Sequence, residues 1–559
     1  MKSKKEILID ITNLQFSIGE KSRNKNLLKN ISFHIKRNEI VGLIGESGSG
    51  KSLTSLCILR LLEKKNFNIS GEISFENKNI LNLNEKEMMR IRGSEISMIF
   101  QEPMSALNPT KKIGEQIFEV FRAHDIFTLE EAKNRINRLV KKVKLDNVQG
   151  LFNKYPHQIS GGQKQRVMIV MALSLRPKLL IADEPTTALD VTIQKEIIDI
   201  LTDLQKSENL SILFISHDLR LVSSISERIL IMKDGEIVEQ GSKKEIFNSP
   251  QKNYTKALMS IIIDNSKRLK ELPTIDTYNN QKKLAIETKN QRIKRLKSIY
   301  SKKPILEIKN LSKFYNTSKN IFVKNKGFKV LKKINLKLYK GETLGLIGES
   351  GSGKTSLSNT ILKIHKFQDG EILFNGLNIS KIKGKALSEF RKNVQIVFQD
   401  PYASLNPLQN IYQIISEPLK FHKISKSKTL YNKCKDLIND VGLNESFLEK
   451  YPHELSGGQR QRVCIARAIS VKPQVLICDE SVSALDISIQ ATVLNLLNKL
   501  KEKYSFTYIF ISHDLSVVRY MSDKILVLHN GEIVEHEDAD IMFKKPKNDY
   551  TKKLINASL

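Results

Sequence analysis

Two glycine-rich segments have the residue types and spacing of a phosphate-binding loop. GLIGESGSGKS spans Gly42–Ser52, GLIGESGSGKT spans Gly345–Thr355, and each follows a short apolar run. Glycines let backbone N–H groups converge on phosphate oxygens, and the positive N-terminus of a following helix strengthens the attraction. Each loop therefore predicts a site for a nucleoside triphosphate, with a lysine at the β and γ phosphates and a hydroxyl for Mg²⁺. The residues assigned to the loops are Gly45, Gly48, Gly50, Lys51 and Ser52, and Gly348, Gly351, Gly353, Lys354 and Thr355.

A pair of adjacent carboxylates follows an apolar run in each half of the chain. These pairs are Asp183–Glu184 and Asp479–Glu480. A carboxylate at the end of a strand can hold Mg²⁺, so the aspartates are assigned to the metal. A neighbouring carboxylate can polarise an attacking water, so the glutamates are assigned as general bases. An acidic pair alone is typical of a solvated turn, but the preceding strand and the upstream loop favour a catalytic role.

The chain is a duplication. FQEPMSALNP, YPHQISGGQKQRV, LLIADEPTTALD and FISHDL in the first half recur as FQDPYASLNP, YPHELSGGQRQRV, VLICDESVSALD and FISHDL in the second. The offsets 456 − 160, 479 − 183 and 513 − 217 all equal 296, so a whole domain is repeated. The segment between the copies is polar and basic, as linkers are. We predict a first domain over residues 1–264, a basic linker over 265–303 and a second domain over 304–559.

Short apolar runs rich in β-branched residues precede the motifs, as in strands of a sheet that is covered on both faces. Helical patterns lie between them, which indicates an α/β fold. Thr128 and Glu131 form a capping box before apolar residues on one helix face, so a helical insertion is expected between the FQEP and ISGGQ motifs. The predicted strands are Glu39–Ile44, Leu179–Ala182, Ser211–Ile215, Leu344–Ile347, Val475–Cys478 and Tyr508–Ile511.

The ordered set of motifs resembles the ATP-binding cassette (ABC) ATPase family over nearly all of both copies. The resemblance implies two tandem P-loop NTPase domains, each with a helical subdomain. It also implies that the P-loop of one copy and the SGGQ signature of the other share each ATP. Lys51, Ser52, Asp183 and Glu184 would then join Ser456, Gly457, Gly458 and Gln459, while Lys354, Thr355, Asp479 and Glu480 would join Ser160, Gly161, Gly162 and Gln163.

The same resemblance assigns further roles. His217 and His513 would contact the γ-phosphate and orient the water, and Gln101 and Gln399 would sense Mg²⁺ and couple the site to a partner. Asp190 and Asp486 would lie in loops that cross between the copies. Small departures are Ile159 in place of the usual leucine and Ser481 in place of the usual proline. Phe314 or Tyr315 would stack on adenine in the second copy, whereas Phe16 in the first is either its counterpart or a core residue.

The EPMSALNP and DPYASLNP segments resemble the peptide-importer branch of the family, which includes dipeptide, oligopeptide, nickel and glutathione systems. The implied partners are two integral-membrane permease subunits and an extracytoplasmic solute-binding protein, with ATP and Mg²⁺ as cofactors. Peptides rank above nickel or glutathione by resemblance only. The cysteine-containing tail of that branch is missing from both copies. A Pro-x-x-x-Tyr-Thr element ends each copy, at Pro250, Tyr254 and Thr255, and at Pro546, Tyr550 and Thr551.

The composition leaves one rival open. The net charge is 91 − 60 = +31, which fits either nucleic acid or a lysine-rich surface. A ribosome-acting ABC protein would also carry two cassettes, but the SHD motifs here continue as Leu-Arg and Leu-Ser. No signal peptide or spanning apolar run is apparent, and four scattered cysteines fit a reducing compartment. We expect a peripheral protein on the cytoplasmic face of the inner membrane, with no nucleic-acid partner.

Overall fold

The computed structural model describes residues 6–19, 25–62, 67–101, 106–124, 127–187, 189–261, 268–315, 328–483 and 485–558. The chain divides into two compact units, one formed by Met1–Leu189 with Ile193–Ile262 and the other by Asp190–Thr192 with Ile263–Leu559. Each unit holds one copy of the repeated motifs, except that Asp190 of the first copy is grouped with the second unit. Each unit mixes helices with sheets, so the predicted α/β class is confirmed. The predicted boundary at residues 264 and 265 lies outside the described residues, as do 102–105 of the FQEP motif, and the domain limits stay predictions.

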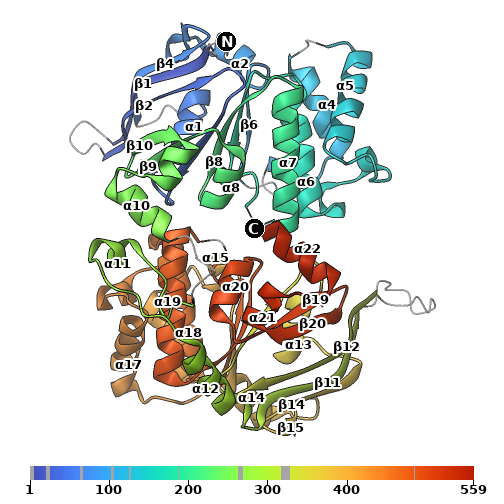
Figure 1. Ribbon diagram of the computed structural model, residues 1–559, viewed down its shortest axis with the longest axis vertical. Helices are drawn as coiled ribbons and strands as arrows, with labels where there is room; N and C mark the ends of the chain where they lie inside the picture. The colour runs from blue at the N-terminus through green and yellow to red at the C-terminus, as the bar shows by residue number, and fades with distance from the viewer. Residues whose placement is uncertain are drawn as a thin grey trace. The chain divides into compact units, whose positions relative to one another are not determined.

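The first unit is built on two sheets (Figure 1). A six-stranded sheet has the order β10-β9-β3-β8-β7-β6, and all its neighbours are parallel except β9 and β10. An antiparallel sheet has the order β2-β1-β4-β5. The elements are β1 (Ile7–Ile18), β2 (Lys25–Lys36), β3 (Ile40–Gly45), α1 (Lys51–Leu59), β4 (Phe67–Phe75), β5 (Lys78–Asn79), α2 (Glu85–Ile91), β6 (Ile96–Ile99), α4 (Ile113–His124), α5 (Leu129–Lys142), α6 (Gly161–Leu173), β7 (Leu179–Asp183), α7 (Val191–Ser207), β8 (Ser211–Ser216), α8 (Leu219–Ile225), β9 (Arg228–Lys233), β10 (Glu236–Ser242), α9 (Lys243–Asn248) and α10 (Asn253–Ser260).

The core of the first unit lies between the two sheets and encloses α1. Every residue of β3, β7 and β8 is buried, as their continuous apolar sequences predict. Leu8 and Phe33 from the antiparallel sheet, Leu43 and Ile181 from the central sheet, and Ile58 of α1 belong to one apolar cluster. Because α1 is packed on both sheets, the loop that precedes it is held at the carboxyl end of β3.

The second unit repeats this arrangement. Its central sheet has the order β16-β17-β18-β13-β19-β20 and its antiparallel sheet has the order β12-β11-β14-β15, which match the first unit strand for strand. The elements are α11 (Ile275–Asn279), α12 (Lys289–Tyr300), β11 (Pro304–Tyr315), β12 (Phe328–Tyr339), β13 (Thr343–Ile347), α13 (Lys354–Ile361), β14 (Asp369–Phe374), β15 (Leu377–Asn378), α14 (Gly384–Asn393), β16 (Val394–Val397), α15 (Pro401–Ser404), α16 (Ile411–Phe421), α17 (Ser427–Asp440), α18 (Gly457–Ile469), β17 (Val475–Asp479), α19 (Ile487–Tyr504), β18 (Thr507–Ile511), α20 (Leu515–Met521), β19 (Lys524–His529), β20 (Glu532–Asp538), α21 (Ala539–Lys544) and α22 (Asp549–Ser558).

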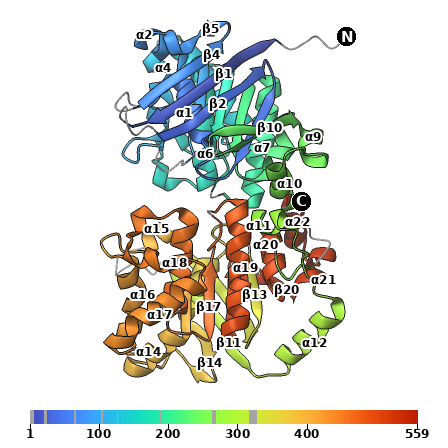
Figure 2. The ribbon, with the colours of Figure 1, turned by 90° about the vertical axis from the view of Figure 1, so that its left-hand side faces the viewer.

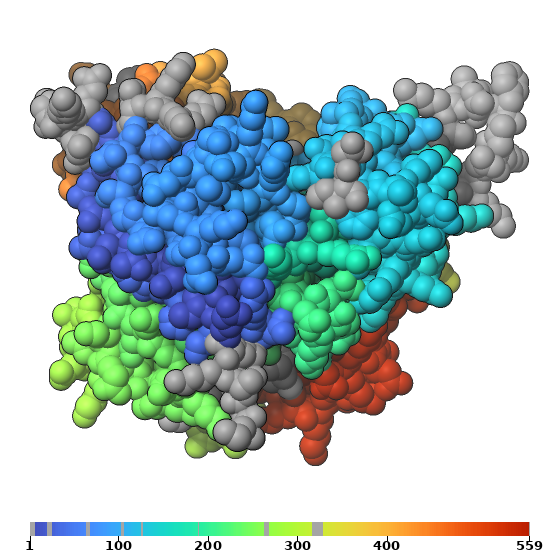
Figure 3. Space-filling view, turned by 90° about the horizontal axis from the view of Figure 1, so that it is seen from above, coloured from blue at the N-terminus to red at the C-terminus, as the bar shows by residue number. Residues whose placement is uncertain are grey.

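Each unit carries the expected helical insertion. In the first unit α4, α5 and α6 gather on one side, away from β1, β2 and β4. In the second unit α16, α17 and α18 gather in the same way, away from β11 and β12 (Figures 1 and 2). The space-filling view shows the α4–α5 region, in cyan, as a lobe beside the blue strands (Figure 3). The predicted capping box is present, because Thr128 accepts from the N–H of Glu131 and Glu131 accepts from the N–H of Thr128. No helix among the described residues is both long and apolar enough to cross a membrane.

Residues 268–303, which all lie within the predicted linker, pack on the second unit, and we call them the docked segment. Arg292 donates to Asp538 at 2.8 Å and Arg295 donates to Asp523 at 2.7 Å. The backbone of Leu272 exchanges two hydrogen bonds with the side chain of Asn495. Burial alone would raise the pKa of Asp523, but Lys501 and Arg295 hold this pKa below its usual value. The polar composition of the segment therefore serves specific ion pairs.

We predict that Arg292→Ala weakens the docking of this segment. The Arg292 side chain is 11% exposed and its partner Asp538 is 18% exposed, and breaking a partly buried pair costs about 2 kcal/mol or more. Hydrogen exchange of the α12 backbone amides should accelerate by about tenfold or more, since 1.4 kcal/mol corresponds to a factor of ten. The exposed Lys294→Ala, two residues along the same helix, should leave the exchange unchanged. Equal exchange in both variants would show that the ion pairs do not hold the segment.

Candidate active site

The phosphate-binding loop of each unit lies between a central strand and the helix that follows it. The Lys51 Nζ donates to the carbonyl oxygens of Gly45 at 2.7 Å and Glu46 at 2.9 Å. The Lys354 Nζ makes the equivalent bonds to Gly348 at 2.7 Å and Glu349 at 3.0 Å. Both lysines are buried, so each ammonium is anchored inside its loop at the N-terminus of a helix. This arrangement concentrates positive charge where a triphosphate would bind.

Two positions in each loop require glycine. The N-cap residue of α1, Gly50, has φ +106°, and the N-cap residue of α13, Gly353, has φ +110°, which are values that other residues rarely adopt. At Gly45 a Cβ atom would lie 2.3 Å from the carbonyl oxygen of Met232 in the neighbouring strand. The glycines therefore permit both the left-handed turn and the close approach of β3 to β9.

The aspartates at the ends of β7 and β17 face the P-loop hydroxyls. Asp183 is 3% exposed and Asp479 is 6% exposed. Burial raises the pKa of Asp183 to about 6, while the hydrogen bond with Ser52 acts in the opposite direction. Burial raises the pKa of Asp479 to about 6 as well, and its contacts include Thr355. Each aspartate is thus a carboxylate that lacks enough positive charge around it.

Each candidate catalytic glutamate contacts a glutamine and a histidine. The Gln101 amide donates to Glu184 Oε2 at 2.9 Å, and His217 Nδ1 lies 3.0 Å from Glu184 Oε1. In the second unit Gln399 donates to Glu480 Oε2 at 2.7 Å, and His513 Nδ1 lies 3.7 Å from the same oxygen. Sequence reasoning assigned the glutamines to Mg²⁺ and did not foresee that they would bind the glutamates.

The backbone of both glutamates is in the left-handed region. Glu184 has φ +47° and Glu480 has φ +48°. A side chain in this conformation costs about 1 kcal/mol or more, and such strain gathers at functional sites. The Glu184 N–H donates to the Ile215 carbonyl and the Glu480 N–H donates to the Ile511 carbonyl, both at 2.9 Å. These bonds to the neighbouring strand hold the strained turn in place.

The surroundings give the two neighbouring carboxyl groups of the first unit different pKa values. Burial would raise the pKa of Glu184, but His217 and Thr187 lower this pKa to about 2. Glu184 therefore stays ionised at neutral pH and is a weak proton acceptor in this conformation. Its carboxylate is suited to orient and polarise a water molecule. In the second unit burial is again outweighed by His513, which lowers the pKa of Glu480.

The residues at the loops fit a magnesium ion. Asp183 Oδ1 is buried and accepts no hydrogen bond from the described residues. The Ser52 hydroxyl is hydrogen-bonded to the same carboxyl group, and Mg²⁺ in phosphate sites prefers one or two such oxygen ligands together with phosphates. Asp479 and Thr355 offer the same donor set in the second unit.

The SGGQ signatures begin helices at another place in each unit. Ser160 is the N-cap of α6 and Ser456 is the N-cap of α18, each in a capping box with the glutamine three residues on. Within the described part of each unit, no hydrogen bond joins Ser160 or Ser456 to the P-loop of the same unit. The structure thus gathers lysine, aspartate, glutamate, glutamine and histidine in each unit and leaves the signature apart from them.

The aromatic candidates differ in exposure. Phe16 is 1% exposed and packs against Phe67 at 5.2 Å, so it is a core residue. Tyr315 is 38% exposed at the end of β11, where Lys313 lies 4.5 Å from its ring. The last residue of β1, Ile18, holds the position in the first unit that Tyr315 holds in the second, and it is 46% exposed.

One contact to the P-loop was missed from the sequence. The Glu349 N–H donates to the hydroxyl of Tyr550 at 3.0 Å, and the Tyr550 ring lies 3.8 Å from that of His529. The sequence signal for this contact is the Pro-x-x-x-Tyr-Thr element that ends the second copy. The last helix of the chain therefore supports the phosphate loop of the second unit.

We predict that Asp183→Asn with Asp479→Asn stabilises the nucleotide-free protein at pH 8 and abolishes its Mg²⁺-dependent turnover. When folding raises the pKa of a carboxyl group, the folded protein loses stability as the pH rises from about 4 to about 6. In this range only the folded state keeps the proton on that carboxyl group. At 1.36 kcal/mol per pKa unit, the loss is about 1–3 kcal/mol at each site. Denaturant unfolding with a metal chelator should show this fall in the wild type and not in the double variant. The exposed Asp199→Asn should behave like the wild type, and a fall that persists in the double variant would refute the assignment.

Comparisons with known proteins agree with this geometry. Residues 28–187 and 331–483 match the family described as ABC transporter, and residues 238–286 match the oligopeptide/dipeptide transporter, C-terminal region. The glutathione import ATP-binding protein GsiA of Escherichia coli O6:H1 is 39% identical to this chain, over 98% of it and 89% of the relative. The GsiA protein of Salmonella choleraesuis is 38% identical over the same shares. The ribosome-acting alternative is not favoured. The chain belongs to the ABC transporter family and is a subunit with two ATP-binding ATPase domains.

Proposed function

We propose that this chain is the motor of an ABC importer for short peptides. ATP would bind at two composite sites, each with the P-loop of one copy and the signature of the other, and its hydrolysis would reset the transporter. The observation that carries the proposal is the matching set of glutamate, glutamine and histidine in both units. Because neither set lacks a member, both sites are proposed to hydrolyse ATP.

At each site the chain supplies positioning and charge. Lys51 and Lys354 would bind the β and γ phosphates through ammonium groups that already point into their loops. Glu184 and Glu480 would accept a hydrogen bond from the attacking water and direct it at the γ-phosphate. His217 and His513 would fix these carboxylates and contact the γ-phosphate. Gln101 and Gln399 would release the glutamate oxygen to which they donate and turn toward the bound phosphates.

Mg²⁺ would be held by Ser52 and Asp183 in one site and by Thr355 and Asp479 in the other. When bound, the ion supplies charge neutralisation for the β and γ phosphate oxygens. The raised pKa of both aspartates supports this role, since a nearby cation would remove the cost of their buried charge.

The signature completes the site because it is the start of a helix. The N–H groups at the start of α6 and α18 and the helix dipole favour a γ-phosphate. Ser160 and Gly161, and likewise Ser456, are exposed and therefore open to such a ligand. ATP would then join the two copies, and loss of the γ-phosphate would separate them.

The proposed partners are two integral-membrane permeases, with a solute-binding protein acting through them, at the cytoplasmic face of the membrane. The similarity to GsiA and the match to an oligopeptide/dipeptide transporter region support an importer. Peptides remain the first candidate substrate, and glutathione is the second because the similar proteins are named for it. Uptake of a labelled dipeptide and of labelled glutathione by cells with and without the chain would separate the two.

We predict that Glu184→Gln with Glu480→Gln traps ATP. The amide keeps the shape of the carboxylate but lacks the negative charge that polarises the attacking water, and the loss of such a group costs about 10²–10⁴-fold. Steady-state ATPase activity should fall by about 100-fold or more while the protein retains bound ATP. The exposed pair Glu130→Gln with Glu502→Gln should keep full activity. Full turnover in the first double variant would refute the assignment of the base.

We also predict that the chain copurifies with permease subunits from detergent-solubilised membranes. Nucleotide depletion and the trapped double variant should change the yield, because ATP closure alters the faces that meet the permeases. Recovery with ribosomes in place of permeases would overturn the importer proposal and restore the ribosome-acting alternative.

A further inference from the structure

An arginine that follows each signature in the sequence makes the same backbone contact in both units. Arg166 and Arg462 each lie six residues after the signature serine, on α6 and α18. Arg166 Nη1 donates to the Lys144 carbonyl at 3.2 Å, and Arg462 Nη1 donates to the Gly442 carbonyl at 3.2 Å. This shared contact shows that the two guanidinium groups occupy equivalent places in their units.

The two arginines differ in their acidic partner. Arg166 Nη2 forms an ion pair with Glu196 of α7. At the equivalent position of α19, 296 residues later, the chain has Thr492, whose hydroxyl donates to the Ser488 carbonyl at 3.0 Å. Within the described part of the second unit, no acidic side chain lies within ion-pair distance of Arg462. Burial lowers the pKa of Arg462, as expected for a cation that is partly removed from water.

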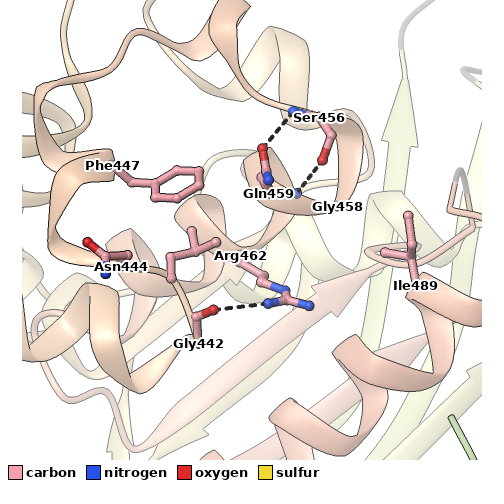
Figure 4. Close-up of a pocket in the computed structure, with 9 residues that line it drawn as sticks. Gly442, Asn444, Phe447, Ser456, Gly458, Gln459, Arg462 and Ile489 are labelled. Carbon is pink, nitrogen blue, oxygen red and sulfur yellow. Dashed lines mark hydrogen bonds between the residues drawn. The ribbon is translucent and has the colours of Figure 1, made fainter. Parts of the chain in front are cut away.

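A pocket of about 340 Å³ is lined by Arg462, which is half-buried. Phe447, Leu443 and Ile489 form its apolar wall, and Asn444, Ser456 and Gln459 add polar groups. Figure 4 shows the Arg462 guanidinium between Gly442 and Ile489, with the signature residues across the pocket. The volume is at the lower end of the range for small-molecule sites, which is about 300–1,000 Å³.

We propose that this pocket binds a small monocarboxylate with a compact apolar group. The carboxylate would take the place on Arg462 that the Glu196 carboxylate occupies on Arg166. Guanidinium and carboxylate form paired, charge-assisted hydrogen bonds, which would offset the cost of the partly buried charge. The apolar group would lie against Phe447 and Ile489.

The site would distinguish the two halves of the protein. Among the described residues, the arginine after the second signature has no carboxylate partner, whereas the arginine after the first signature has one, and Ser456 and Gln459 line the same pocket. Under the proposed function these residues serve the ATP bound by the first P-loop. A bound carboxylate would therefore act on one of the two ATP sites and leave the other unchanged. The binding itself does not depend on the proposed function.

The test uses benzoate as the probe, titrated into the full-length protein by calorimetry and by ligand-detected NMR. The wild type should bind one benzoate per chain with a dissociation constant on the order of 1 mM, as expected for a ligand of this size. Thr492→Glu restores the acidic partner found in the first unit, and it should weaken binding by at least tenfold. Thr492→Val keeps the size of the side chain without adding charge, and it should bind like the wild type.

The reciprocal change provides a second readout. Glu196→Thr frees Arg166 and should add a second benzoate site. Benzamide, which lacks the charge, should not compete with benzoate. Unchanged binding in Thr492→Glu would overturn the proposal, and so would inorganic phosphate that binds as tightly as benzoate and is lost in the same variant. Loss of ATP trapping in Glu184→Gln with Glu480→Gln would instead count against the proposed function and leave the benzoate result unaffected.

Discussion

The proposed active site of each unit depends on two adjacent carboxyl groups, buried or partly buried, that must behave differently. Asp183 sits at the end of a buried strand with too little positive charge nearby, so its pKa rises to about 6. Glu184, one residue on, is turned into the left-handed region and meets His217, so its pKa falls to about 2. Environments that separate the pKa values of two carboxyl groups suit those groups to different chemical roles. In the proposed site the aspartate would receive a cation, and the glutamate would stay ionised to orient a water molecule.

The fold positions these groups through elements whose sequences are simple. The continuous apolar strands, the glycine-rich loops and the capping box of α5 were all predictable, because each follows from local periodicity or from a local backbone need. The residues brought together by tertiary pairing were harder. Nothing in the sequence around Gln101 indicates that its amide would bind Glu184, because such contacts join residues that are far apart in the chain. The same holds for Tyr550 and the P-loop.

Two patterns were ambiguous for a physical reason. The basic, polar composition of residues 268–303 is typical of a solvated linker, yet arginines of this segment form partly buried ion pairs with the second unit. Composition gives the charge of a segment and not the location of its partners. Phe16 has the residue type of a stacking aromatic, but the pleat of β1 turns it into the core. Alternation along a strand decides which face a side chain occupies, and a bulge between Ile11 and Leu14 shifts that alternation.

The two copies share their sequence motifs and differ in the residues that contact those motifs. His217 lies 3.0 Å from its glutamate, whereas His513 lies 3.7 Å from its own. Tyr315 ends the strand in one unit where Ile18 ends it in the other, and Thr492 replaces the acid that pairs with the arginine behind the signature. The two copies therefore share the candidate catalytic residues and differ in the residues around them. The proposed composite site can be tested most directly by a structure of the Glu184→Gln, Glu480→Gln protein with ATP and Mg²⁺. The account predicts that Lys51 and Ser456 contact one triphosphate while Lys354 and Ser160 contact the other. Both triphosphates held by a single copy, with the signature serines facing solvent, would contradict it.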